Sequence, residues 1–195
     1  MLVKRSIVAE SGTHNDFCVG DVIRFALNDG EQVQAMAMQE TDKGMLFVLV
    51  DCLTKEYPMF KSLRGMQSHE ITYENSDLRK NLNGEILERF PEEIRKRMIS
   101  VNAAGDMLRL PTEKEIFGEN SYGEDEPDAV YRFDPMELRR NRIAFQGDNG
   151  AWEWYWLENK VKDSAAGFAY VYDDGGANYD YASDALGVRP VFHLS

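Results

Sequence analysis

Carboxylates and aromatic rings are interleaved over the stretch from Trp152 to Asp184. All three tryptophans of the chain occupy alternate positions from Trp152 to Trp156, and Glu153 lies among them. Further along, Asp173 and Asp184 accompany a tyrosine-rich segment. Two carboxylates beside aromatic rings could supply the acid and the base of glycoside hydrolysis. Because the chain has 34 acidic residues, such a pattern arises easily by chance, and hydrolysis is only the second hypothesis.

The turn Asp173-Asp174-Gly175-Gly176, followed by Asn178, Asp180 and Asp184, offers oxygen ligands of the kind that calcium prefers. Its spacing does not match an EF-hand loop. A glycine-permitted β-turn with solvated carboxylates is therefore the favoured interpretation, and we expect neither a metal nor a cofactor.

Tyrosines recur in two alternating pairs, Tyr170/Tyr172 and Tyr179/Tyr181, among Asp, Asn, Ser and Gly residues. Rigid rings give contact area and small polar residues give adaptable hydrogen bonds, a composition typical of binding surfaces. Aromatic rings also fill cores, because they bury the largest apolar areas. A binding surface and a structural role are equally supported by the residues alone.

Familiar catalytic motifs are absent. The chain has no GxSxG, Walker-type, GxGxxG or HExxH pattern, and its three histidines, His14, His69 and His193, are far apart in the sequence. We therefore expect a protein that is not an enzyme.

The formal net charge of −12, from 34 acidic and 22 basic residues, argues against nucleic-acid binding and against anionic membranes. The basic group Arg139, Arg140 and Arg142 is interpreted as a solvated helix end or loop. No run of about 18 apolar residues is present, so we expect no membrane insertion. The first residues lack the apolar region of a signal peptide. This predicts a cytoplasmic location, with a phage particle as the alternative.

The first third of the chain has the pattern of antiparallel β-structure. Residues 19–27, 32–39 and 45–53 read as strands separated by turns at 28–30 and 42–44, which predicts a three-stranded meander. We expect Val22, Ile23 and Phe25 to point inward. Cys18 and Cys52 could pair only if their strands are neighbours, and two buried free thiols in a reducing compartment are the expectation.

Two to three short helices are predicted within residues 76–118. Ser76 is a suitable N-cap, and Asn83-Gly84 would end the helix that it begins. A second helix would start at Pro91. Apolar residues every four positions predict one buried helical face, consisting of Ile86, Phe90, Ile94 and Met98.

A third helix is indicated by the capping box from Thr112 to Glu115, and Gly118 would close it. Residues 119–134 read as an acidic surface loop. The last third alternates apolar runs with turns, and its clearest strands are 168–172 and 188–194. Pro190 restricts the second of these strands to an edge, a strand start or a bulge.

An extended conformation would place all three tryptophan rings on one face, where a core row is the conservative interpretation, and would turn Tyr155 and Glu153 to the other face. At 195 residues the chain suits one core. We therefore expect an N-terminal extension over residues 1–18 and one α+β domain over residues 19–195, with antiparallel sheets.

Five segments follow one another in a characteristic order along the chain. They are Gly20-Asp21-x-Ile23-x-Phe25, Tyr73-Glu74-x-Ser76-Asp77-Leu78-Arg79-x-x-Leu82-Asn83, Leu110-Pro111-Thr112-x-x-Glu115-x-Phe117-Gly118, Trp154-Tyr155-Trp156-Leu157-Glu158-Asn159 and Gly187-Val188-Arg189-Pro190. This set resembles an uncharacterised bacterial and phage domain family whose members carry a Trp-Trp-Leu-Arg-Ser segment and end in Gly-Val-Arg-Pro. That family is similar to the formylglycine-generating-enzyme branch of C-type-lectin-like folds.

The resemblance implies a C-type-lectin-like fold with a framework strand over residues 187–190 and a ligand-facing surface just before it. Some relatives resemble targets of diversity-generating retroelements, which vary residues at such positions. The surface residues implied here are Tyr170, Tyr172, Asp173, Asn178, Tyr179, Tyr181 and Ser183.

Two features depart from that family. Glu158-Asn159 stands where members have Arg-Ser, which puts a framework contact of the arginine in doubt. Formylglycine-generating enzymes use a cysteine pair in their catalytic half, whereas Cys18 and Cys52 both lie in the first third of this chain. Their catalytic activity is therefore not expected.

The leading hypothesis is a ligand-recognition domain that presents this surface to a protein or glycan. A carbohydrate hydrolase using carboxylates such as Glu153, Asp173 or Asp184 is one alternative, and a structural component of a phage or prophage particle is another. The sequence does not predict the oligomeric state.

Overall fold

The computed structural model describes residues 17–147 and 150–195. The expected N-terminal extension, with His14, lies almost wholly outside the described residues. The chain forms a mixed α+β structure whose paired strands run antiparallel, with a few short helices, as the sequence predicts. In the described part of the chain, no helix is long and apolar enough to cross a membrane.

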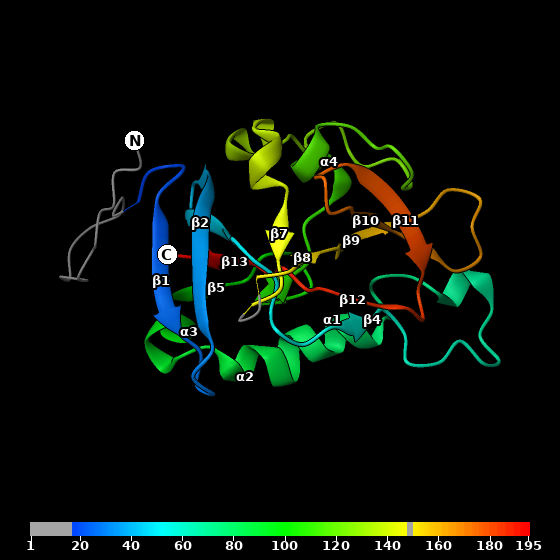
Figure 1. The fold of residues 1–195 in the computed structure, drawn as a ribbon, viewed down its shortest axis with the longest axis horizontal. Helices are drawn as coiled ribbons and strands as arrows, with labels where there is room; N and C mark the ends of the chain where they lie inside the picture. The colour runs from blue at the N-terminus through cyan, green and yellow to red at the C-terminus, as the bar shows by residue number, and fades with distance from the viewer. Residues whose placement is uncertain (1–16, 148–149) are drawn as a thin grey trace.

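A six-stranded sheet forms one end of the molecule (Figure 1). The predicted meander is confirmed, and it is joined by a strand from the far end of the sequence that pairs with β3 on one side and with β5 and β6 on the other. The strands are β1 (Val22–Ala26), β2 (Gln32–Thr41), β3 (Gly44–Leu49), β5 (Met98–Ile99), β6 (Leu108–Arg109) and β13 (Val191–Leu194). Pro190 directly precedes β13, in agreement with a strand-start position.

A three-stranded sheet in the order β11-β10-β9 lies at the other end, and two short strand pairs connect the halves (Figure 1). The three strands are β9 (Tyr155–Lys160), β10 (Gly167–Val171) and β11 (Ala177–Tyr181). The short pairs are β4 (Tyr57–Pro58) with β12 (Ala185–Leu186) and β7 (Ala144–Phe145) with β8 (Trp152–Glu153).

Ser76 caps the first helix as predicted, because its hydroxyl accepts the backbone N–H of Arg79. The predicted stop at Asn83-Gly84 is wrong: α1 (Asp77–Asn81) continues through the π-helix η2 (Leu82–Ile86) into α2 (Leu87–Arg89). The Asn83 side chain donates to the carbonyl of Leu108 and accepts from its N–H, so it joins the helix to β6 instead of ending it.

The second helix, α3 (Glu92–Arg97), begins after Pro91 as predicted. The predicted continuous apolar face is corrected, because Phe90 adopts an extended conformation at the end of α2 and Met98 belongs to β5. Both side chains and Ile86 are nevertheless buried, while Ile94 is partly buried against the same core.

The capping box at Thr112 is confirmed in α4 (Glu113–Phe117), and Gly118 ends this helix with a φ of 86°. Residues 119–134 contain no helix or strand up to the 3₁₀ turn η3 (Asp134–Glu137), in agreement with the predicted loop. Two further 3₁₀ turns are η1 (Ser68–Glu70) and η4 (Arg139–Asn141).

Both faces of the large sheet are covered. On one face the rings of Phe47 and Phe192 stack with centroids 5.5 Å apart, beneath the helices that lie along one side of the molecule in Figure 1. On the other face Val48 and Val191 belong to a second apolar cluster. Ile23 and Phe25 pack inward as predicted, whereas Val22 lies on the alternate side of β1 outside both clusters. Both thiols are free and Cys52 is buried as expected, but the expected burial of Cys18 is wrong, because this residue is exposed.

Candidate functional site

The predicted row of three indoles is broken, because the chain leaves the extended pairing at Trp154, between β8 and β9. Trp152 is 69% exposed, Trp154 is half-buried, and Trp156 is buried with its Nε1 donating to the carbonyl of Tyr57 at 2.8 Å. Tyr155 faces the opposite side as predicted, but that side is also core, and its hydroxyl bonds within the interior.

Tyr170 is buried with only 4% of its surface exposed, so its expected place on a ligand-facing surface is corrected. Burial raises the pKa of its hydroxyl to about 12. Its ring stacks on Trp154 at a centroid distance of 5.5 Å, and half-buried Tyr172 lies 5.0 Å from the same indole. This aromatic group belongs to the core margin rather than to an open surface.

Tyr179 and Tyr181 are the exposed part of the expected surface, at 51% and 67%. They oppose Ala169 and Gly167 across the β10–β11 ladder, whereas Asn178 opposes Tyr170. Alternation along β11 therefore turns the two exposed rings to the face opposite Tyr170. The residues implied by the resemblance thus divide between two faces of the sheet and do not form one surface.

The face of β11 that carries Tyr179 and Tyr181 includes a third tyrosine ring, which the sequence did not predict there. Tyr122, from the loop 119–134, lies 5.0 Å from Tyr179 between ring centroids and is 37% exposed. Loop residues carry no periodic signal, so nothing in the sequence connected Tyr122 to β11. Together we call Tyr122, Tyr179 and Tyr181 the tyrosine patch.

Tyr122 is held from beneath by a buried carboxylate. Glu113, in the first turn of α4 and 0% exposed, accepts the backbone N–H groups of Tyr122 at 3.1 Å and of Gly123 at 2.8 Å. The Glu113 N–H in turn donates to Asn159 at 2.7 Å. Asn159 therefore anchors the loop that carries Tyr122.

The outward edge of β11 is closed by its own side chains. The N–H of Tyr179 donates to the Asn178 Oδ1 at 2.9 Å, and the N–H of Tyr181 donates to the Asp180 Oδ1 at 2.8 Å. Edge strands with free donors invite pairing with another strand. These two contacts favour binding through side chains rather than through strand addition.

The acidic segment forms a turn as expected, but the expectation of solvated carboxylates is wrong for Asp174, whose carboxylate is paired with Arg139. Arg139 pairs with the Asp174 carboxylate at 2.7 Å and also bonds its carbonyl, while Gly176 N–H donates to the same carboxylate at 2.8 Å. Asp173 is half-buried and Ser183 is exposed. Among the described residues, no group of three or more His, Cys, Asp or Glu side chains is placed to hold a metal ion.

The carboxylates considered for hydrolysis have other partners. Burial, with a contribution from neighbouring Glu56, raises the pKa of Glu153 to about 7. Asp184 is exposed beside Asp180, and a hydrogen bond between these carboxyls raises the pKa of Asp184. Hydrolytic pairs flank a sugar about 5–9.5 Å apart, so carboxyls in direct contact do not have that geometry.

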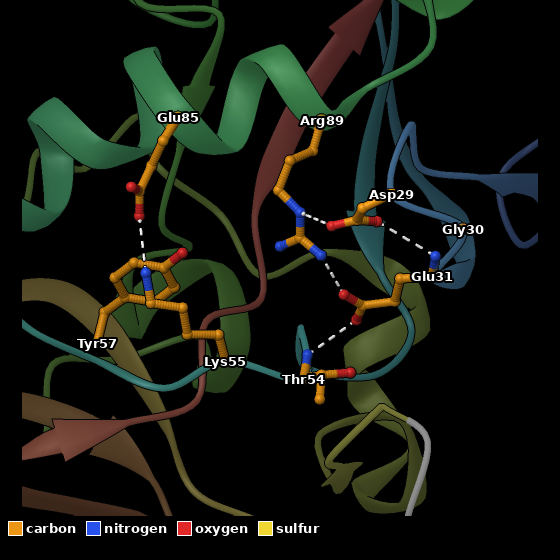
Figure 2. A pocket seen from close by; sticks show the side chains of 8 residues that line it. All are labelled: Asp29, Gly30, Glu31, Thr54, Lys55, Tyr57, Glu85 and Arg89. Carbon is orange, nitrogen blue, oxygen red and sulfur yellow. Dashed lines mark hydrogen bonds and ion pairs between the residues drawn. The ribbon is translucent and has the colours of Figure 1, made fainter.

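A polar cleft of about 820 Å³ lies on another part of the molecule (Figure 2). Its walls come from the continuous helix of η2 and α2, from the β1–β2 turn and from residues 54–57 at the start of β4. The sequence predicted these segments only as structural elements. Sequence reasoning missed this site because its residues come from three separate segments. They are Asp29, Gly30, Glu31, Thr54, Lys55, Tyr57, Glu85 and Arg89.

One side of the cleft is a fixed framework. Arg89 donates to Asp29 at 2.6 Å and to Glu31, while Glu31 accepts the backbone N–H of Thr54 at 2.8 Å (Figure 2). The opposite side is more open. There Lys55 pairs with Glu85 at 3.1 Å, and both side chains are more than half exposed.

Comparison with known proteins gives one family. A model described as "Domain of unknown function (DUF6273)" matches residues 48–195. No curated protein and no solved structure matches.

Proposed function

We propose that this chain, which belongs to the DUF6273 family of domains of unknown function, is a ligand-recognition domain that binds a protein through the tyrosine patch. The observation that carries this proposal is the exposed pair of contacting rings Tyr122–Tyr179, with Tyr181 67% exposed beside Tyr179 on β11. Tyrosine is enriched among the residues that dominate binding energy in protein interfaces.

Preorganisation supports this assignment. The Tyr122 backbone is fixed by buried Glu113, and Tyr179 is packed against the Tyr122 ring. Rings that are already ordered lose little conformational entropy on binding, so more of their contact energy appears as affinity. The closed edge of β11 leaves side chains as the binding elements of this strand.

The C-type-lectin-like fold expected from the motifs is part of the same proposal. Support comes from the segment Gly187–Pro190, which is buried throughout and fits a framework role. Arg189 donates to the carbonyl of Leu49 at 2.5 Å and to the hydroxyl of Tyr155 at 3.0 Å. It thereby ties the segment to β3 and to β9, which belongs to the same three-stranded sheet as the patch strand β11.

The test places a photocrosslinking amino acid at exposed Ser183, next to the patch, and captures partners from extract of the native cells. Affinity for the captured protein is then measured for Tyr179→Ala/Tyr181→Ala and for Tyr131→Ala, a control that removes another exposed ring. We expect the double variant to lose affinity by roughly tenfold to several hundredfold, as loss of interface tyrosines does. The control should keep wild-type affinity.

Equal affinity in the double variant and the control would refute the patch as the site. The same proteins are also applied to a glycan array. Glycan binding that requires Tyr179 and Tyr181 would replace the protein partner by a carbohydrate, and turnover of a glycan would instead favour the hydrolase.

A further inference from the structure

On the open side of the cleft, an ammonium group contacts both an aromatic ring and a carboxylate. The Lys55 Nζ lies 4.4 Å from the centroid of the Tyr57 ring and 3.1 Å from the Glu85 carboxylate. The neighbouring Tyr57 hydroxyl and the Lys55 ammonium together lower the pKa of the Glu85 carboxyl. An aromatic face beside a carboxylate is a general arrangement for binding organic cations.

The charge balance of the cleft favours a cation. Its lining carries three carboxylates, Asp29, Glu31 and Glu85, against Lys55 and Arg89. Arg89 is already shared between Asp29 and Glu31, so its charge is compensated locally. Glu85 has only the exposed Lys55 as its cationic partner among the ion pairs of the described residues. With Lys55 displaced, the cleft would attract a cation. The net charge of the whole protein, −12, acts in the same direction.

The Lys55 side chain can be displaced from its contacts with Glu85 and Tyr57 at little cost. Its side chain is 64% exposed and that of Glu85 is 52% exposed, so the pair is accessible to solvent and weak. Tyr57, in contrast, is fixed, because it belongs to β4, pairs with Leu186 and is only 4% exposed. The ring therefore keeps its place when the exposed lysine is displaced.

The helix that presents Glu85 is also unusual. Glu85 belongs to the π-helix η2, and such π-helical turns within α-helices occur often at functional sites. Asn83, in the same turn, is fixed to β6 by its side chain. The wall that carries Glu85 is thus rigidly attached to the large sheet.

We propose that this cleft is a binding site for a primary ammonium group, and that Lys55 occupies the site in the free protein as an internal competitor. The ligand is a lysine side chain of a peptide or a free alkyl diamine, and the remaining volume receives the groups attached to it. The site is separate from the tyrosine patch and does not rest on the function proposed for it.

The proposal is tested by NMR titration with three probes. N-acetyl-lysine N-methylamide represents a peptide lysine, 1,5-diaminopentane represents a free amine, and N-acetyl-norleucine N-methylamide is the neutral analogue. The proteins are the full chain, Lys55→Ala, Glu85→Gln and Lys80→Ala. Lys80 is an exposed lysine of α1 outside the cleft lining, so its variant controls for the loss of one positive charge.

Lys55→Ala should bind the ammonium probes roughly fivefold more tightly than the wild type, since a solvent-exposed ion pair and ring contact together compete with about 1 kcal/mol. Lys80→Ala should bind as the wild type does. Glu85→Gln should bind more weakly than the wild type, and Lys55→Ala/Glu85→Gln should lose the gain. The stronger of the lysine and diamine probes identifies the ligand source.

Three outcomes overturn the proposal. The first is a Lys55→Ala variant that binds no ammonium probe or binds no more tightly than Lys80→Ala. The second is equal affinity for the neutral norleucine probe. The third is a gain in Lys55→Ala that survives replacement of Glu85. All of the substituted side chains are exposed or half exposed, and circular dichroism verifies that each variant is folded.

Discussion

The ring of Tyr122 lies 5.0 Å from the ring of Tyr179, with an angle of 53° between the ring planes. The first ring belongs to a loop after α4, and the second belongs to an edge strand formed much later in the chain. Their contact therefore couples the order of the loop to the order of the tyrosine patch. This coupling can be measured without knowing the partner.

Tyr122→Ala is expected to destabilise the fold modestly and to free the Tyr179 ring. In a double-mutant cycle of Tyr122→Ala and Tyr179→Ala, the coupling energy from urea unfolding should be about 0.5–1.5 kcal/mol, as for other aromatic pairs. Tyr181→Ala serves as the reference, because no ring contact connects it to Tyr122 among the described pairs. Additive effects of the two substitutions would mean that the ring contact has no energetic role.

Replacing Asn159 by alanine should release the loop that carries Tyr122. The buried N–H of Glu113 would lose its acceptor, and the contact of Asn159 with Glu126 would also be lost. The expected cost is about 1–3 kcal/mol of unfolding free energy. Amide exchange at Tyr122 and Gly123 should accelerate before global unfolding.

Asn75→Ala is the matched control for that substitution, since Asn75 makes an exposed side-chain bond to the Glu70 carbonyl in another loop. It should leave exchange at Tyr122 unchanged. Unaltered exchange in Asn159→Ala would show that the loop is held by other contacts.

The raised pKa of Glu158 predicts that the free energy of unfolding falls as the pH rises. Burial raises the pKa of its carboxyl to about 8, against the opposing effect of Arg109. Above its ordinary pKa of 4.5 the unfolded chain releases this proton while the folded protein keeps it. Folding therefore binds a proton in this range, and stability is lost as the pH rises from about 4.5 to 8.

Glu158→Gln keeps the shape of the protonated acid and should remove this loss. The variant should match the wild type near pH 5 and exceed it at pH 8 by roughly 2–4 kcal/mol in urea unfolding. Glu124→Gln, which replaces an exposed glutamate for which no such burial exists, is the control. Parallel pH curves for wild type and Glu158→Gln would contradict the assignment of a buried, protonated Glu158.

Local signals in the sequence predicted the local structure. Ser76, Thr112 and Gly118 were identified as caps because each cap acts on backbone groups only a few residues away. The β1–β3 meander followed from alternation and turn residues in one continuous segment. The antiparallel strands of the last third were predicted for the same reason.

Features that depend on distant contacts were missed. The helix passes Asn83 because the side chain of this residue bonds β6. Tyr170 and Tyr179 have the same residue type and similar local sequence, yet their exposure differs because only one of them packs against Trp154. The cleft is formed by three separate segments, and no sequence pattern within any one of them predicts it.

Strand β13 has a consequence for how the protein is made. It inserts between β3 on one side and β5 and β6 on the other, and it is synthesised after all of them. While the ribosome is translating the intervening residues, β3 exposes an unpaired apolar edge, which is a hazard for intermolecular pairing. The large sheet is complete only after β13 has left the exit tunnel. The yield of folded protein should therefore depend on the rate of translation of the C-terminal half and on chaperone binding during that time.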